Sequence, residues 1–198
     1  MTTVAEKPSQ QSRKPVRKAV SLAAFKKKYL EKTAYKYEWK DGQVEKEEYM
    51  RASERYIIDN ITTKFNLLAD YQQGNRIMGE VDCYFSTLLA YRRPDAAYLT
   101  QDQISHPEES AEAPALVIEV SSPSNLDEQN IAKMLEYFEA GVKLVWYIYP
   151  HVKQVWVYTA PKEVTICHQG DVCHAEPVIP GFSINVSDIF YQKPLQKP

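Results

Sequence analysis

The sequence predicts a mixed α/β domain, in which a central mixed β-sheet is flanked by helices. Two strand-like apolar runs, 116–121 and 144–149, enclose a helical segment at 130–140 that ends at Gly141. A strand, a crossover helix and a second strand form a βαβ unit, so part of the sheet is parallel. Asp41-Gly42 lies between two alternating runs and predicts an antiparallel hairpin. The sheet should therefore contain both kinds of pairing.

Length and composition favour one globular domain. A chain of 198 residues can bury one substantial core, and 44% hydrophobic residues with 14 tyrosines are typical of a folded protein. We expect a disordered basic arm over residues 1–20, a folded domain over 21–191 and a C-terminal tail over 192–198. No run reaches the roughly 18 apolar residues of a membrane span, so we expect no membrane partner.

The first half of the chain shows helical and strand signals in turn. Ser21 can cap a short helix that runs to about Glu31, and the runs 35–39 and 44–49 should form the hairpin. We also expect an amphipathic helix from about Ser53 to Gln73, which ends at Gly74. The evidence is the helical spacing of five apolar residues, which are Ile57, Ile58, Ile61, Phe65 and Leu68. Later strands are expected at 78–85, 95–99, 116–121, 144–149 and 154–158.

The cysteines suggest a reducing compartment. Their count of three is odd and their spacing is not that of a disulfide framework, so we expect a cytoplasmic protein. Cys167-His168 and Cys173-His174 admit a zinc site as one interpretation. Adjacent strand residues point to opposite faces, however, and no Cys-x-x-Cys pair is present. We therefore favour two arms of an ordinary hairpin that turns at Gly170-Asp171.

The charge of the folded part is acidic. The net charge is −2, but residues 1–20 hold five basic residues and one acid, which leaves 19 basic against 25 acidic residues and a net of −6. A protein surface that binds the phosphate backbone of DNA normally carries a net positive charge. DNA binding would therefore depend on a local basic patch, on a metal ion or on the basic arm.

Three residues form a candidate catalytic site. Asp95 follows a proline at the start of a strand, Glu119 lies inside the apolar run 116–121, and Lys133 lies on the following helix. An ionised carboxylate inside an apolar strand costs several kcal/mol unless a cation or a metal ion compensates it. Two carboxylates that converge on a divalent ion beside a lysine can activate water against a phosphodiester. A structural ion pair between Glu119 and Lys133 is the alternative.

Two further residues extend this site. Tyr137 follows Lys133 by four residues, so both lie on one helical face, where the tyrosine either reaches the site or simply packs. Glu38, Glu80 and Asp82 are further acids that can face the cleft. Asp82 is the favoured one, because it alternates with the apolar residues Val81 and Cys83.

The order of these residues resembles the PD-(D/E)XK nuclease superfamily, and more closely its Uma-type family of restriction endonucleases. The superfamily's usual lysine position is Ser121 here, but in the Uma-type branch the lysine lies on the helix, which fits Lys133. The resemblance covers residues 21–191. It also rests on four further segments, which are 120–124, 140–142, 179–182 and 186–190.

The resemblance implies a restriction-endonuclease-like core and a DNA endonuclease that depends on Mg²⁺ or Mn²⁺. Asp95, Glu119, Lys133 and Tyr137 would be the catalytic residues. Asp95, Glu119 and the backbone carbonyl of Val120 would hold the metal, with Asp82 as a further candidate. The partner would be double-stranded DNA, and a homodimer with two clefts facing one duplex is the simplest way to address both strands. The hydrophobic strands near Trp146 and Trp156 and the hairpin over 151–154 offer apolar area and an exposed edge for this dimer.

Two other classes of protein remain open. A catalytically silent nucleic-acid-binding or protein-interaction module would retain the fold, and the acidic folded part and Gln129 favour it. A structural or regulatory interaction protein would instead use the tyrosines and the indoles of Trp39, Trp146 and Trp156 at an interface.

Overall fold

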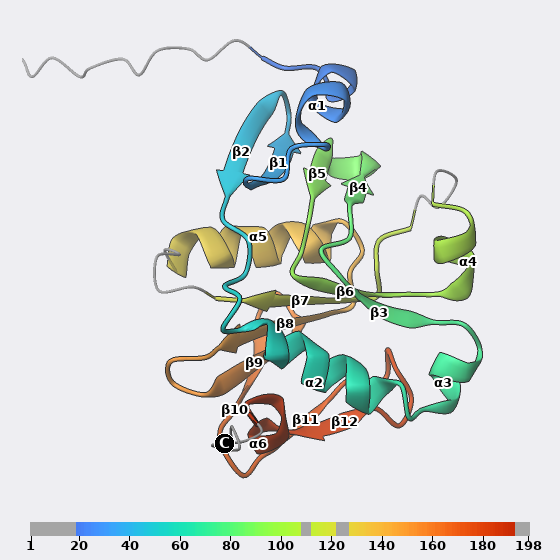
Figure 1. Cartoon of the computed structure of the whole chain (residues 1–198), viewed down its shortest axis with the longest axis vertical. Helices are drawn as coiled ribbons and strands as arrows, with labels where there is room; N and C mark the ends of the chain where they lie inside the picture. Colours follow the sequence, from blue (N-terminus) through green and yellow to red (C-terminus); the bar gives the residue numbers. More distant parts are fainter. Residues whose placement is uncertain (1–18, 108–111, 122–126, 193–198) are drawn as a thin grey trace, which may run out of the picture.

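The structure is a computed structural model that describes residues 19–107, 112–121 and 127–192. Its centre is a six-stranded sheet with the order β10-β9-β8-β7-β6-β3 (Figure 1). The bounds of these strands are β3 (Arg76–Gly79), β6 (Ala96–Leu99), β7 (Leu116–Val120), β8 (Leu144–Tyr149), β9 (Gln154–Ala160) and β10 (Glu163–Cys167). β7 and β8 are parallel and the other pairs are antiparallel, so the predicted mixed sheet is confirmed.

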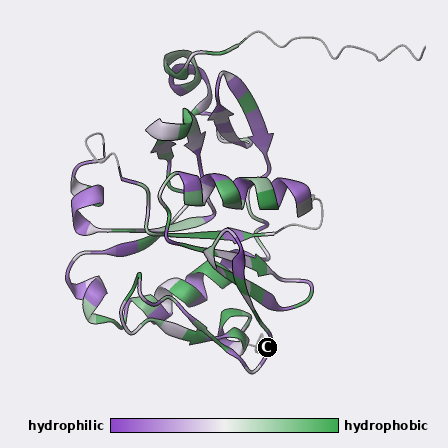
Figure 2. Ribbon diagram, turned by 180° about the vertical axis from the view of Figure 1, so that it is seen from behind, coloured by the Kyte–Doolittle hydropathy of each residue, from purple (hydrophilic) through white to green (hydrophobic). Residues whose placement is uncertain are grey.

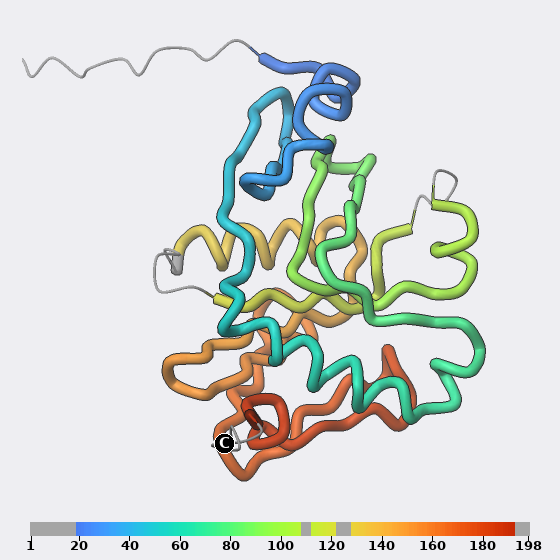
Figure 3. Tube along the Cα trace, viewed as in Figure 1, coloured from blue at the N-terminus to red at the C-terminus, as the bar shows by residue number. Residues whose placement is uncertain are grey.

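A second, four-stranded sheet with the order β2-β1-β5-β4 lies beside the central one. It consists of β1 (Lys36–Lys40), β2 (Gln43–Glu47), β4 (Cys83–Phe85) and β5 (Ala90–Arg92), and a short 3-10 turn, η1 (Ser86–Leu88), joins the last two. The chain leaves the central sheet after β3, forms β4 and β5, and returns as β6 (Figure 3). The first helix, α1 (Leu22–Tyr29), covers this smaller sheet. Ser21 caps it as predicted, and it ends slightly before the expected Glu31.

Helices cover both faces of the central sheet. The βαβ crossover helix, α5 (Asp127–Glu139), lies on one face, and α2 (Arg55–Phe65) lies on the other (Figure 1). The small sheet stands on the α5 side. The remaining elements are α3 (Ala69–Gln72), α4 (Gln101–Ser105), β11 (Val172–His174), β12 (Ser183–Asn185) and α6 (Val186–Ile189).

Strand alternation divides the core into two layers. In β7, Leu116 and Ile118 belong to the apolar cluster under α2, whereas Val117 belongs to the cluster under α5. β8 repeats this division with Trp146 on the α2 side and Val145 on the α5 side. Figure 2 shows hydrophobic residues along these central strands. Because side chains alternate, Glu119 must point to the α5 face, like Val117.

The predicted helix over 53–73 is wrong in its length. It consists of α2 and α3, with a break in which Leu68 is extended at φ −88° and ψ 155°. Leu68 packs against the core cluster beneath α2, whereas Leu67 is 78% exposed. A continuous helix would keep the helical spacing of the apolar residues but would move Leu68 away from this packing. Tertiary contacts therefore decided where the helix breaks. Gly74 adopts φ +96° just after α3, where the sequence places a helix end.

The predicted strand over 78–85 is also wrong, because it is two strands in two different sheets. Glu80 breaks it: its φ is 51°, in the left-handed region, and its N–H donates to the carbonyl of Asp95 at 3.1 Å. This bend carries the chain from the central sheet into the smaller one.

The hairpin expected at Gly170-Asp171 is a turn between two sheets. β10 pairs with β9, and β11 pairs with β12, so the two cysteine-containing strands do not pair with each other. Asp171 closes the turn by accepting the N–H of His168 at 2.7 Å. Cys83, Cys167 and Cys173 are buried free thiols.

Substitution of Phe65 tests how much the apolar layer beneath α2 contributes to stability. Its ring is fully buried and lies edge-on to Tyr71, Tyr98 and Phe182. We expect Phe65→Ala to lower the free energy of unfolding by about 3–5 kcal/mol, because it removes buried area and leaves a cavity. Urea denaturation measures this, with Leu67→Ala as a control that should change stability by less than about 1 kcal/mol. Equal losses in both variants would contradict this placement of Phe65.

Candidate active site

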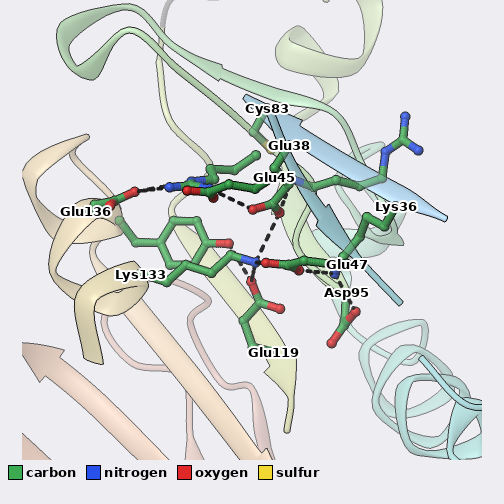
Figure 4. A network of polar contacts seen from close by, with 12 residues as sticks. Lys36, Glu38, Glu45, Glu47, Cys83, Asp95, Glu119, Lys133 and Glu136 are labelled. Carbon is green, nitrogen blue, oxygen red and sulfur yellow. Dashed lines mark hydrogen bonds and ion pairs between the residues drawn. The ribbon is translucent and has the colours of Figure 1, made fainter. Parts of the chain in front are cut away.

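A cavity of about 690 Å³ lies where the two sheets and α5 meet. Its wall includes part of β2, the segment that leads to α2, one face of α5, the end of β7 and Asp95, which directly precedes β6. Asp95, Glu119 and Lys133 line it, so three residues that are far apart in the sequence share one wall (Figure 4). The other lining side chains used below are Lys36, Glu45, Glu47, Arg92 and Glu136.

Asp95 lies at the point where the chain re-enters the central sheet. It is 5% exposed, and both of its carboxylate oxygens have partners. Oδ1 accepts from the ammonium of Lys36 at 3.2 Å, and Oδ2 accepts from the backbone N–H of Val120 at 2.8 Å. The antiparallel register of β6 and β7 pairs Ala96 with Ile118, so Asp95 lies opposite the part of β7 that carries Glu119.

Glu119 points from β7 toward α5. Its Oε1 accepts from the Lys133 ammonium at 3.2 Å and from the Tyr137 hydroxyl at 2.5 Å. The two donors are one helical turn apart, and Tyr137 is fully buried behind the cavity wall. Burial raises the pKa of Glu119, and the nearby charge of Asp95 raises it further, although Lys133 opposes this shift.

Lys133 is shared among three carboxylates. Its Nζ lies 3.2 Å from Glu119, 3.0 Å from Glu38 and 3.3 Å from Glu47. Burial alone lowers the pKa of a lysine, but these three charges raise the pKa of Lys133 well above its ordinary value. The ammonium is therefore charged at neutral pH and fixed at the centre of the site.

The smaller sheet contributes further charged residues to the site, of which only Glu38 was expected from the sequence. Glu38, on β1, is fully buried and accepts from Arg92 at 2.9 Å and from the backbone N–H of Arg93 at 2.9 Å. Burial opposes ionisation, but Lys133 and Arg92 lower the pKa of Glu38 to about 2. Arg92 also binds Glu45 and Glu136, and Lys40 binds Glu136.

This network is nearly balanced in charge. Together the linked side chains comprise six carboxylates and four cations, a formal net charge of −2, which is the charge that one divalent cation would neutralise. The carboxylates are Glu38, Glu45, Glu47, Asp95, Glu119 and Glu136, and the cations are Lys36, Lys40, Arg92 and Lys133.

A signal for part of this network is present in the sequence. Lys36 and Glu38 alternate with Tyr35, Tyr37 and Trp39, and alternate residues share one face of a strand. Two charged residues on the same face of an aromatic-rich strand indicate a polar site on that side. Nothing in the sequence indicates which distant groups meet them.

Two of the proposed metal ligands have a different environment from the one expected. Asp82 binds Arg93 Nε at 2.6 Å, is about a third exposed and does not line the cavity, so we remove it from the candidate ligands. Val120 does line the cavity, and its observed contact there is through its N–H, which donates to Asp95.

The donor set suits a hard divalent cation. Within the described residues, no group of three or more His, Cys, Asp or Glu side chains is arranged to hold a metal ion. Mg²⁺ binds through one or two carboxylates and keeps several waters, so Asp95 and Glu119 meet its requirement. Among the described contacts, none occupies Oε2 of Glu119. Zinc sites typically use Cys or His ligands, and neither residue type is among the described residues that line this cavity.

One family model matches most of the chain. The family Uma2, described as "Putative restriction endonuclease", matches residues 22–187. The chain belongs to this family. The match lies within the 21–191 domain expected from the sequence and includes every residue of the charged network.

The fold of this Uma2 member is also found in a solved structure. A chain from Anabaena variabilis ATCC 29413, titled a putative nuclease belonging to DUF820, superposes with a TM-score of 0.73 at 20% sequence identity. The alignment covers 86% of this chain and 97% of that one, so the two share a fold. No curated protein matches the sequence. In the described part of the chain, every helix is too short or too polar to cross a bilayer.

Substitution of Glu38 tests whether the charged network stabilises the fold. We expect Glu38→Gln to lower the free energy of unfolding at pH 7 by about 3 kcal/mol, because Arg92 and Lys133 lose a buried counter-charge. The folded pKa of about 2 lies below the ordinary 4.5, so the stabilisation is present above pH 4.5 and disappears as the pH falls toward 2. Urea titrations across this range should show a shallower pH dependence in the variant.

Glu45→Gln is the matched control. It removes a carboxylate from the same Arg92, but Glu45 is about half exposed, so the loss should be below about 1 kcal/mol. Equal losses in both variants would contradict a special role for the buried carboxylate.

Proposed function

We propose that this protein is an endonuclease that uses Mg²⁺ or Mn²⁺ to hydrolyse phosphodiester bonds in double-stranded DNA. The observation that carries the proposal is the convergence of Asp95 and Glu119 with Lys133 on one cavity wall. Membership of a family described as putative restriction endonucleases supports it, as does a fold shared with a chain titled a putative nuclease.

In this proposal, Asp95 and Glu119 hold the metal, and the carbonyl of Val120 is a further ligand. A bound divalent ion lowers the pKa of water and neutralises charge on a phosphate. The bond from Val120 N–H fixes the Asp95 carboxylate, and the Tyr137 hydroxyl fixes Glu119. These contacts hold both carboxylates toward the cavity before substrate arrives, which lowers the reorganisation needed for reaction.

Lys133 is the residue proposed to act on the phosphate. Its ammonium is adjacent to Glu119 and lines the cavity, so it can stabilise the negative charge that develops on the phosphoryl oxygens. Tyr137 is buried behind Glu119 and does not line the cavity, so we assign it a positioning role.

Phosphate contacts outside the cavity must come from local basic groups. The exposed lysines of α1, Lys26, Lys27 and Lys28, form one such group on the smaller sheet's side of the molecule. The basic arm over 1–20 lies almost entirely outside the described residues. Because residues 21–198 carry a net charge of −6, we expect the basic arm to supply much of the phosphate contact. Deletion of residues 1–20 should therefore weaken DNA binding and flatten its salt dependence.

A silent DNA-binding or protein-interaction module is the second candidate. The observation that favours it is that lysines already pair with both candidate ligands, Lys36 with Asp95 and Lys133 with Glu119. Such a module would bind its partner without a metal and would leave DNA intact.

Nicking of supercoiled plasmid with and without Mg²⁺ or Mn²⁺ distinguishes these candidates. We expect metal-dependent cleavage that Asp95→Asn and Glu119→Gln each reduce by at least about 100-fold, together with metal binding measured by calorimetry. Lys133→Met should retain the metal and lose the rate. Asp82→Asn is the matched control, since it changes an acid bound to Arg93 outside the cavity wall. Wild-type rates in the Asp95 and Glu119 variants would refute the site.

The sequence suggests a homodimer surface near Trp146 and Trp156 and at the hairpin 151–154, and we propose the neighbouring edge strand β10 in its place. Trp146 is fully buried and β8 lies inside the sheet, so neither is available to a partner. The edge strand β10 is available, since Val164 and Ile166 are 44% and 40% exposed there. Pairing of two β10 edges would extend the sheet across a two-fold axis.

Light scattering tests this dimer at micromolar concentration. We expect a dimer mass for the wild type and a monomer mass for Ile166→Lys, because a charge on the exposed face of an edge strand opposes pairing. Val152→Lys, in the exposed turn after β8, is the control and should stay dimeric. A monomeric wild type would exclude the dimer, and a dimeric Ile166→Lys would exclude this edge.

A further inference from the structure

Lys36 is a second buried lysine in the site, and the proposed chemistry does not use it. It begins β1, and its side chain is only 3% exposed. Lysine is rarely buried to this extent without a dedicated partner. Its ammonium lies 3.2 Å from Oδ1 of Asp95 and 3.4 Å from Oε2 of Glu47 (Figure 4).

The two lysines differ in what they contact. Lys133 is shared among Glu38, Glu47 and Glu119, whereas Lys36 pairs with Asp95 and with Glu47. Oδ2 of Asp95 is already bound to the backbone of β7, so Oδ1 is the oxygen left to meet a cation. Lys36 occupies that oxygen.

Glu47 gives Lys36 a second partner. Lys36 and Glu47 are directly opposite each other in the β1–β2 hairpin, so the backbone register keeps them together. The Glu47 side chain is 36% exposed and lines the cavity, which makes it the more open of the two carboxylates that bind Lys36. An ammonium displaced from Asp95 can stay bound to Glu47 without leaving the site.

We propose that Lys36 is an internal competitor for the metal: its ammonium binds both Asp95 Oδ1 and Glu47 in the metal-free protein, and it gives up Asp95 and stays with Glu47 when a divalent cation binds Asp95. This inference rests on the proposed metal site and adds that Lys36 lowers the affinity of that site for the metal. Lys36 keeps Asp95 compensated while no metal is present, which avoids the cost of an unpaired buried carboxylate.

The competition has a quantitative consequence. A ligand's apparent affinity is reduced by the fraction of protein in which its site is free. If Lys36 occupies Asp95 in about nine of ten metal-free molecules, the affinity is reduced about tenfold. Removal of the ammonium should therefore strengthen metal binding, although it removes a group from the proposed active site.

Calorimetric titration with Mn²⁺ tests this consequence. We expect Lys36→Met to bind Mn²⁺ at least about tenfold more tightly than the wild type, and Lys36→Arg to restore the weaker binding, because it returns the positive charge. Lys40→Met is the matched control. It removes the same charge from the same strand, but Lys40 binds Glu136 rather than a candidate ligand, so its affinity should stay within about twofold of the wild type.

The possible results separate this inference from the proposed function. If the wild type binds Mn²⁺ and Lys36→Met binds equally or more weakly, competition by Lys36 is overturned and the metal site stands. If Lys36→Met and Lys40→Met tighten Mn²⁺ binding equally, the gain in affinity comes from the lower positive charge of the whole site, and the inference also fails. If neither the wild type nor Lys36→Met binds Mn²⁺, both proposals fail.

Amine labelling of the wild type provides a test that needs no variant. An acylating reagent followed by peptide mass spectrometry reports the reactivity of each lysine. We expect Mn²⁺ to increase the labelling of Lys36 several-fold, because its ammonium gives up the buried Asp95 and stays with the more open Glu47, and to leave Lys40 unchanged. Unchanged or decreased labelling of Lys36 in the metal-bound protein would overturn the proposal.

Discussion

The burial of the Glu119 carboxylate in the central sheet is the constraint on which the site depends. Strand alternation directs it to the face that α5 covers, where an unpaired charge would be costly. Lys133 and Tyr137 compensate it from one face of that helix. Lys133 is itself buried and requires further carboxylates, which the smaller sheet supplies. One buried acid thus links the helix and both sheets.

This dependence explains why the smaller sheet is part of the functional unit. Its β1–β2 hairpin holds Glu38 and Glu47 against Lys133, and its last strand ends at Arg92, three residues before Asp95. The same segment therefore closes the ion network and starts β6. Each buried charge in this site already has a partner, so in the proposed nuclease a metal would have to compete with those partners.

The elements predicted well from the sequence are those whose signals are local. The βαβ unit and the 41–42 hairpin turn follow from periodicity and turn residues, and the structure has both. The breaks at Leu68 and Glu80 were not predicted, because their causes are distant: Leu68 packs on the core, and the N–H of Glu80 bonds to Asp95. A continuous pattern of apolar residues carries no information about such long-range contacts.

The sequence alone determined the family, the mixed sheet and the order of Asp95, Glu119, Lys133 and Tyr137, because residue type, spacing and helical phase are local properties. The tertiary structure alone decided which charges meet there. It brought Lys36 to Asp95 across 59 residues of chain and directed Asp82 to Arg93 instead of the cavity. Ion pairs between distant segments depend on how sheets and helices pack, and packing is decided by the whole chain at once.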